Sequence, residues 1–452
     1  MRNSCLVPLI LISACAWGQE QTDLKQILQR LDRLEEENQA LVSEVRQLRE
    51  ELGLKKNAAP APLTEGQPAS PPIDEQLAIQ QERIEEHEQG KVGTEHRLPV
   101  QLTGMVLFNA FLNGRNSGPQ LDPVVAVPNS SQGTGGGTLR QSVLGLKFQG
   151  PEIFGGGKVN GSIFMDFFGG SGQSLNQLVR LRVATVDLQW KNTTLTVGQD
   201  KPILAPREPE SLAQLGISPL TASGNLWTWQ PQARLEQRFA FGENSGLRAQ
   251  IGEYQTDERS NGIPNLAEYT SALATTRPAV QGRFEFWRQF TGDRRIEIAP
   301  SFDFSRSHLL GRSIASHAWS VDWLMRPHAR FDFSGQFFEG DNVGTIGGLH
   351  QGITVFAYNR VRAVHAVGGW AQFQYRPTNR LTLDIYGGQE DDRNSDLMPG
   401  AIGKNQTYAA NILYRLASNV LGSFEYSQVR TTYFTIGTSL NNHYDLALAY
   451  LF

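Results

Sequence analysis

Tyr444-Asp445-Leu446-Ala447-Leu448-Ala449-Tyr450-Leu451-Phe452 are the final residues of this chain. Counted back from Phe452, every second residue is large and apolar or aromatic, and the intervening Ala449, Ala447 and Asp445 are small or polar. This period of two predicts a strand with one apolar face. An exposed apolar edge aggregates in a soluble sheet, whereas a strand that closes a barrel in lipid avoids that problem. The last strand of a soluble sandwich is the alternative at this point.

The composition excludes two classes of protein. A net charge of −4 over 452 residues gives no electrostatic case for a nucleic-acid partner. After the first residues there is no run of about 18 apolar residues, which excludes a helical membrane protein but not a barrel, because half of each barrel strand faces a polar lumen. Both cysteines, Cys5 and Cys15, precede the main body, so we expect no disulfide there.

Residues 1–18 have the features of a secretory signal peptide. Arg2 is followed by the apolar stretch 6–12, and Ala16-Trp17-Gly18 forms a small-x-small cleavage site. Ile12-Ser13-Ala14-Cys15 offers a second interpretation, because it is similar to a bacterial lipobox with Cys15 as the lipidated residue. Either interpretation predicts export from the cytoplasm.

A heptad repeat in residues 19–56 predicts a coiled coil, which we expect in the periplasm. The seam residues, spaced alternately three and four apart, are Leu24, Ile27, Leu31, Leu34, Asn38, Leu41, Val45, Leu48 and Leu52. A single solvated helix is the alternative. A seam this narrow needs partner helices, so we expect a homo-oligomer; Asn38 would fix its register and by itself favours two strands over three. An Ala/Pro-rich linker (57–72) and a short helical segment (73–97) are expected before the main domain (98–452).

The main domain changes to a period of two from Gln101 onward and predicts an all-β, antiparallel barrel of about sixteen strands. Short Gly/Asn/Pro-rich turns are expected at 151–157, 191–194, 241–246, 291–295, 327–330, 377–380 and 417–419. Long loops are expected at 113–138, 169–177, 199–231, 254–278, 305–316, 338–368, 388–406 and 428–442. Short turns that alternate with long loops are typical of outer-membrane barrels, whereas a soluble sandwich or propeller would show no such asymmetry.

Individual strands support the barrel and locate one irregularity. Within 296–304 the isoleucines and phenylalanines would face lipid, and Glu297, Ser301 and Asp303 would face the lumen. Between Val179 and Trp190 the apolar face changes parity near Ala184, which predicts a β-bulge.

The third long loop mixes charges, prolines and apolar residues, which suits a loop that packs on the barrel wall and narrows the pore. Its candidate constriction residues are Lys201, Arg207, Glu208 and Glu210. An ordinary surface loop is the alternative interpretation.

Arginines at lumen-facing positions form a candidate pore-lining, anion-binding set. They are Arg180, Arg182, Arg234, Arg238, Arg248 and Arg283. Basic rings in a pore attract anions and bind carboxylate or phosphate in a bidentate manner. Glu236, Glu285 and Asp303 would offset this charge, so a preference for anions stays open at this stage.

Catalysis is not expected, and neither is a cofactor or a metal. The eight histidines have no metal-ligand spacing, and no nucleophile-elbow motif is present. His350 and His365 are the only histidines placed for an outer-loop active site. The run Glu390-Asp391-Asp392 together with Asp396 could bind a divalent ion that bridges lipopolysaccharide, with a solvated loop as the alternative.

The layout of leader, coiled coil, linker, strand-rich body and terminal Phe452 resembles that of the trimeric DcaP-like porins. The stretches 182–190 (RVATVDLQW) and 196–202 (TVGQDKP) are similar to a strand pair of the phosphate-selective OprP/OprO-type porins. This resemblance implies a trimer of sixteen-stranded barrels that passes small, often anionic, solutes by diffusion. The lysine-rich ladder of the phosphate-selective group is not evident, and arginines are more frequent.

We therefore expect a porin in the bacterial outer membrane for passive diffusion of small hydrophilic solutes. Its partners would be outer-membrane lipids, further copies of itself and the barrel assembly machinery, which would recognise the terminal Phe452. A barrel-anchored structural or adhesion protein, acting through its coiled coil or outer loops, is the alternative function.

Overall fold

The structure is a computed structural model that describes residues 100–452, apart from 131, 171–176, 257–277, 310–311, 350–351 and 357–359. The expected signal peptide, coiled coil, linker and short helical segment lie outside the described residues. Within the described part, no helix has the length and apolar character needed to cross a membrane.

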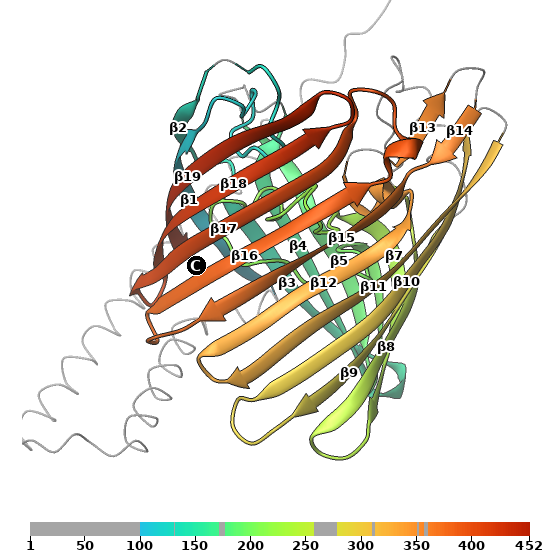
Figure 1. Cartoon of the computed structure of the whole chain (residues 1–452). Helices are drawn as coiled ribbons and strands as arrows, with labels where there is room; N and C mark the ends of the chain where they lie inside the picture. The colour runs from blue at the N-terminus through green and yellow to red at the C-terminus, as the bar shows by residue number, and fades with distance from the viewer. Residues whose placement is uncertain are drawn as a thin grey trace, which may run out of the picture. The chain divides into compact units, whose positions relative to one another are not determined.

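The described chain forms a closed antiparallel β-barrel, as the sequence predicts (Figure 1). Its main sheet has 17 strands, of which the short β2 and the longer β3 both pair with β1 and follow each other along one position of the wall, giving sixteen positions. The strands are β1 (Val100–Asn113), β2 (Gly135–Thr138), β3 (Val143–Ile153), β4 (Gly157–Gly169), β5 (Leu178–Gln189), β6 (Thr193–Asp200), β7 (Gln230–Ala240), β8 (Ser245–Tyr254), β9 (Ala279–Gln289), β10 (Arg295–Leu309), β11 (Arg312–His328), β12 (Phe331–Asp341), β15 (His365–Tyr375), β16 (Leu381–Asp392), β17 (Ile402–Ala417), β18 (Val420–Tyr433) and β19 (Gly437–Leu451).

All seven predicted short turns join consecutive strands, and most of the long loops are also found. The predicted fifth and eighth loops are wrong: β10 and β11 run to within two residues of each other, and only residues 434–436 separate β18 from β19. The ends of these strands are polar and rich in serine and threonine, which is typical of loops in a sequence. In the structure they are strand residues of the barrel wall. The sixth loop contains a small separate sheet of β13 (Ile353–Phe356) and β14 (Arg360–Ala363), preceded by the 3₁₀ turn η2 (Val343–Ile346).

The wall has polar side chains inside and apolar side chains outside, the reverse of a water-soluble core. In β19 Leu446 is 60% exposed and Asp445 is 2% exposed. In β10 Glu297, Ser301 and Asp303 are buried and Ile296, Ile298 and Phe304 project outward, which confirms the predicted faces. A continuous apolar exterior of this kind suits a hydrocarbon environment.

The final strand closes the barrel. β19 pairs with β18 on one side and with β1 on the other, from Met105 opposite Leu451 to Asn113 opposite His443. Phe452 extends this pairing, because the Gly104 N–H donates to the Phe452 carbonyl at 2.9 Å and the Phe452 N–H donates back at 3.1 Å.

The parity change in β5 is a β-bulge. Phe164 of β4 lies opposite Val183 and Met165 lies opposite Leu181, so Arg182 is the additional residue. On one side of the bulge Val179 and Leu181 project outward, and on the other side Val186 does, while Thr185 is buried. Arg180 and Arg182 therefore keep their side chains on the inner face.

Candidate functional site

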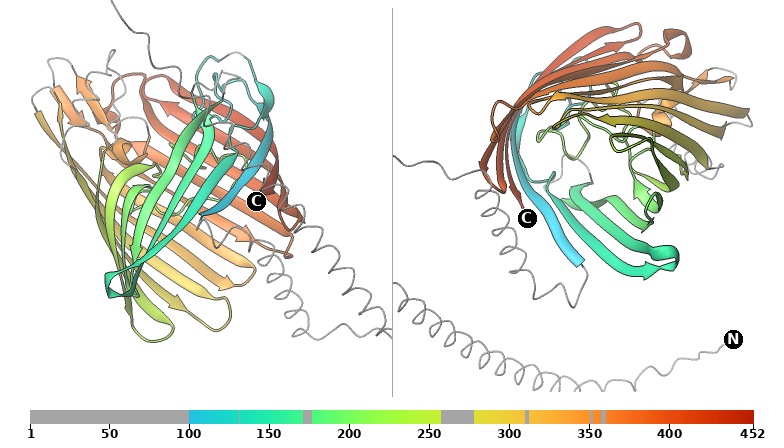
Figure 2. Two further views of the ribbon diagram at one scale, coloured as in Figure 1. Left: turned by 180° about the vertical axis from the view of Figure 1, so that it is seen from behind. Right: turned by 90° about the horizontal axis from the view of Figure 1, so that it is seen from below.

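The third loop, residues 201–229 between β6 and β7, lies inside the barrel against its wall (Figure 2, green segments in the right panel). Wall side chains from widely separated strands hold its backbone. The Gln281 side-chain carbonyl accepts from the Ile203 N–H at 2.7 Å, Asn109 donates to the Leu212 carbonyl at 2.8 Å, and Asn405 donates to the Ala222 carbonyl at 2.9 Å. These contacts fix the loop at several points around the interior.

Apolar residues of this loop also pack into separate clusters on the wall. Leu204 lies with Phe338 and Ala318, Leu212 with Leu107, and Leu220 with Trp370 and Tyr386. The loop packs on the wall with its apolar residues and presents its charged residues to the lumen. These two roles explain why its sequence mixes both kinds of residue.

The loop approaches the wall most closely near Gly224. Gly224 has φ +94°, and a Cβ atom there would lie 2.2 Å from the Gly369 carbonyl oxygen of β15. Leu220 and Ala222 also have positive φ values, 60° and 59°, which is uncommon for residues with side chains. Tight packing of the loop holds this backbone.

Four arginines and three carboxylates form an ionic cluster between the loop and the wall, in which Arg295 of the wall bonds Glu297. Arg207 of the loop bonds Glu297, lies 2.8 Å from Asp322 and lies 3.3 Å from Glu285. From the wall, Arg283 contacts Asp322 and Glu285 at 2.8 and 2.7 Å, and Arg248 contacts Glu285 at 2.6 Å. Burial alone would lower the pKa of Arg207, but the charges of Glu297 and Asp322 raise it. The carboxylates compensate all but one of the arginine charges, and the cluster anchors the loop.

A second cluster joins arginines to aromatic rings on the inner face. We call it the arginine–aromatic cluster; its members are Arg140, Arg180, Arg182, Asp166, Phe168 and Trp229. Arg180 lies 2.6 Å from Asp166 and Arg182 lies 3.6 Å from it.

The aromatic rings of this cluster lie under its guanidinium groups. Phe168 is 4.4 Å from the Arg140 guanidinium carbon, and Trp229 is 4.9 and 4.8 Å from those of Arg180 and Arg182. Such stacking stabilises a cation by about 0.5–2 kcal/mol without neutralising it. The cluster itself therefore contains three guanidinium groups and one carboxylate, which pairs with Arg180 and Arg182, and an excess of positive charge remains within it.

The other two predicted arginines lie in isolated pairs. Arg234 lies 2.8 Å from Asp200, and the more exposed Arg238 lies 2.7 Å from Glu236. The six predicted arginines thus do not form one ring: two belong to the arginine–aromatic cluster, two to the ionic cluster, and two are individually paired.

All four predicted constriction residues, including Arg207, line a cavity on the short-turn side of the loop. Lys201 lies 2.6 Å from Glu208, which also accepts from the Ser218 hydroxyl at 2.7 Å. Burial would raise the pKa of Glu208, but the charge and hydrogen bond of Lys201 lower it, so Glu208 is ionised at neutral pH. Glu210 is exposed and accepts from the Gln374 amide at 2.6 Å.

Three wall residues of this cavity were missed by the sequence reasoning. Arg326 and Arg376 each lie 2.6 Å from Asp332, and all three line a space of about 380 Å³ together with the loop. A signal was present in the sequence, because Arg326-Pro327 and Arg376-Pro377 are near repeats that place an arginine just before a turn. Arg140 was also missed, since it lies in the break between β2 and β3.

The structure describes only part of the alternative sites that were considered from the sequence. His350 lies outside the described residues, and His365 on the outer side of β15 contacts Asp341 at 2.8 Å and Glu339 at 3.5 Å. Glu390 and Asp392 are buried, while Asp391 on the opposite face of β16 pairs with Lys404. Glu390, Asp391 and Asp392 lie in a strand rather than in a loop, with Glu390 and Asp392 on its inner face and Asp391 on its outer face. Among the described residues no cluster suited to a metal ion is found.

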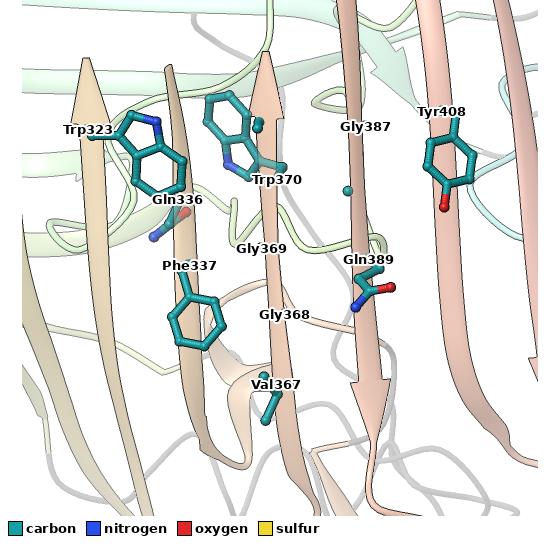
Figure 3. Close-up of a pocket in the computed structure, with 12 residues that line it drawn as sticks. Trp323, Gln336, Phe337, Val367, Gly368, Gly369, Trp370, Gly387, Gln389 and Tyr408 are labelled. Atoms are coloured by element: carbon teal, nitrogen blue, oxygen red, sulfur yellow. The ribbon is translucent and has the colours of Figure 1, made fainter. Parts of the chain in front are cut away.

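A further hollow of about 410 Å³ lies on the outer side of the wall (Figure 3). It is lined by Phe337, Val367 and Tyr408 around Gly369 and Gly387, where side chains are missing from the apolar exterior. It therefore belongs to the outer surface and not to the pore.

Comparison with solved structures identifies the same fold in known outer-membrane proteins. The outer membrane channel DcaP of Acinetobacter baumannii superposes with a TM-score of 0.64 and 17% identity, over 78% of this chain and 97% of that chain. An anion-selective porin from Comamonas acidovorans gives a TM-score of 0.53 and 10% identity, over 78% and 99%. OprB of Pseudomonas putida gives 0.52 and 9%, over 80% and 97%.

No family model and no curated protein sequence matches the chain. The superposition on DcaP confirms, as a shared fold, the resemblance to DcaP-like porins that was inferred from the sequence.

Proposed function

We propose that this chain is an integral porin of the bacterial outer membrane that lets small hydrophilic solutes diffuse through its barrel. The observation that carries the proposal is the closed sixteen-position wall with buried polar side chains and exposed apolar ones. Barrels of this strand number leave room for an aqueous channel. The porin folds of the comparison structures support the same conclusion. Lipids of the outer membrane and the barrel assembly machinery would be its partners, and its copies would associate as a trimer.

We also propose that the third loop narrows the pore and that the pore prefers anions. Support for the preference comes from the arginine–aromatic cluster, which holds three guanidinium groups and one carboxylate, Asp166. Outside the cluster, Asp122 acts on Arg140 and Glu208 acts on Arg182. A fixed excess of positive charge attracts anions within about a Debye length, roughly 10 Å at 0.1 M salt. The paired arginines elsewhere on the wall contribute much less.

Planar-bilayer recording tests the function. Purified protein should give stepwise currents of open-channel size, and its zero-current potential in a KCl gradient should have the sign of chloride preference. An electrically silent barrel would contradict the porin proposal and would favour the structural or adhesion alternative.

The anion preference has a separate test. The double variant Arg180→Ala, Arg182→Ala should move the zero-current potential toward that of an unselective channel. Arg238→Ala is the matched control, because Arg238 is already paired with Glu236 and 57% exposed. An unchanged potential in the double variant would reject the assignment.

A further inference from the structure

The cavity between the third loop and strands β11, β12 and β15 has charges of both signs in separate places. At one end Arg326 and Arg376 share the single carboxylate of Asp332, which leaves one positive charge in excess. At the other end Glu208 is neutralised by Lys201, and Glu210 has no cation within ion-pair distance among the described residues, which leaves one negative charge in excess. Arg207 also lines the cavity, but its guanidinium group is already bound by Glu297, Asp322 and Glu285. The cavity therefore has an excess charge of each sign and is not uniformly basic.

One wall side chain connects the two ends. The Gln374 amide N–H donates to the Glu210 carboxylate at 2.6 Å, and its carbonyl oxygen accepts from the Arg376 guanidinium. The donor group of the Gln374 amide therefore lies at the Glu210 carboxylate, and its acceptor group lies at the Arg376 guanidinium group.

We propose that this cavity is a binding site for small zwitterionic solutes that carry an ammonium and a carboxylate group on the same carbon atom, as an α-amino acid does. The ammonium would donate to Glu210 and the carboxylate would accept from Arg376 and Arg326, the same donor and acceptor polarity that Gln374 presents. The exposed Glu210 and the partly exposed side chains of Arg326 and Arg376 (35% and 31%) are accessible from the cavity. Its volume of about 380 Å³ is that of a small-molecule site.

Charge selection follows from this arrangement. A simple anion meets the arginines but is repelled by Glu210, and a simple cation meets Glu210 but is repelled by the arginines. A zwitterion satisfies both ends and adds no net charge. This site differs from the arginine–aromatic cluster, which has no carboxylate in excess, and the inference rests on the proposed porin function.

Flux measurements on the full chain in proteoliposomes test the proposal. The probes are labelled L-alanine (zwitterion), propionate (anion) and L-alaninamide (cation), each at low and high concentration. Alanine flux should saturate and, at low concentration, exceed that of both analogues. Glu210→Gln should lower alanine flux several-fold and leave propionate flux equal or higher, because only the ammonium partner is lost.

Two further variants sharpen the result. Arg376→Gln should lower alanine and propionate flux while raising that of alaninamide. Arg415→Gln, at an exposed residue that bonds the Ser418 carbonyl in the turn after β17, should leave the flux ratios of the three probes unchanged. Heat-modifiable migration on gels checks that each variant is folded.

The outcomes separate the two proposals. If no probe crosses and no current is seen, the porin function fails and the site fails with it. If all probes cross without saturation, or if Glu210→Gln leaves the alanine-to-propionate ratio unchanged, the porin function stands and the zwitterion site is rejected.

Discussion

Asp122 is a buried carboxyl group in the first loop, and neither of its oxygens has a hydrogen-bond partner among the residues that the structure describes. Burial, followed by the charge of Asp445, raises its pKa from 3.8 to about 8; Glu425 acts in the same direction and Arg140 opposes it. The folded-state pKa lies above the unfolded one, so the loop should lose stability as the pH rises from about 4 to about 8.

Trypsin cleavage at the exposed Arg115 of the same loop measures this effect. The wild-type loop should be cut faster at pH 9 than at pH 6, relative to Asp122→Asn, which removes the titrating group and also controls for the pH dependence of trypsin. Equal pH profiles for the two proteins would contradict the assignment.

For the arginines, the sequence predicts the strand face on which each side chain lies but not its ion-pair partner. Strand parity predicts the face on which Arg180, Arg182, Arg248 and Arg283 lie, because parity depends only on neighbours in sequence. Their partners could not be predicted, since Asp322 and Arg283 are brought together by the register of nonadjacent strands. The balance of charge in the lumen, and hence the contrast between the two arginine clusters, depends on these long-range pairings.

At the scale of elements, Arg207 is the ionic anchor of the third loop. Arg207→Gln would leave Glu285, Glu297 and Asp322 with fewer cations. Breaking a buried ion pair costs about 3–5 kcal/mol. Because the Arg207 side chain is 20% exposed, we expect a smaller loss of stability, about 1–3 kcal/mol.

Urea unfolding should show this loss, and bilayer recording should show a shift of ion preference toward cations and a noisier current as the loop loosens. Arg234→Gln, which breaks only the pair with Asp200, is the control; equal effects of the two changes would argue against the anchor.

The strand pair β5–β6 gives a second prediction at this scale. Gly198 has φ +143°, and a Cβ atom there would lie 2.0 Å from the Ala184 carbonyl oxygen, next to the bulged segment. Gly198→Ala should therefore lower the temperature at which the barrel unfolds on heated gels. Gly242→Ala is matched in positive φ (+121°) but has open space around it, so it should have a smaller effect. A similar loss of unfolding temperature in both variants would mean that backbone strain, and not the contact with the Ala184 carbonyl oxygen, causes the loss.

Elements were predictable where local chemistry defines them. The Pro/Gly/Asn turns and the parity change of the bulge are local signals, and both were correct. The loops expected at 305–316 and 428–442 were wrong, because serine and threonine in a lumen-facing strand look like loop residues until the opposite face is known to be apolar.

At the scale of the whole molecule, the apolar exterior predicts that a charge is tolerated according to its depth. Leu446, near the middle of β19, and Leu440, near its loop end, both project outward. An arginine should cost about 2–4 kcal/mol at the middle of the bilayer and about 0–1 kcal/mol near its surface. Leu446→Arg should thus destabilise the barrel in lipid vesicles much more than Leu440→Arg, as measured by urea titration. Equal losses would contradict a membrane-embedded wall.

Phe452 acts at the same scale, because it belongs to the closure between the first and last strands. Its backbone pairs with Gly104 and its ring lies over Gly104, where a Cβ atom would come within 2.7 Å of the ring.

Two roles of Phe452 are separable: sealing the barrel, and serving as the terminal signal for the assembly machinery. Deletion of Phe452 should leave secretion intact but reduce the heat-modifiable barrel in the outer membrane, whereas purified protein refolded into detergent should still close, since the remaining β1–β19 pairs extend to Asn113. Normal amounts in the membrane would refute the signal, and failure to refold in detergent would make Phe452 a structural seal instead. Phe452→Trp keeps an aromatic terminus and should behave as the wild type in both measurements.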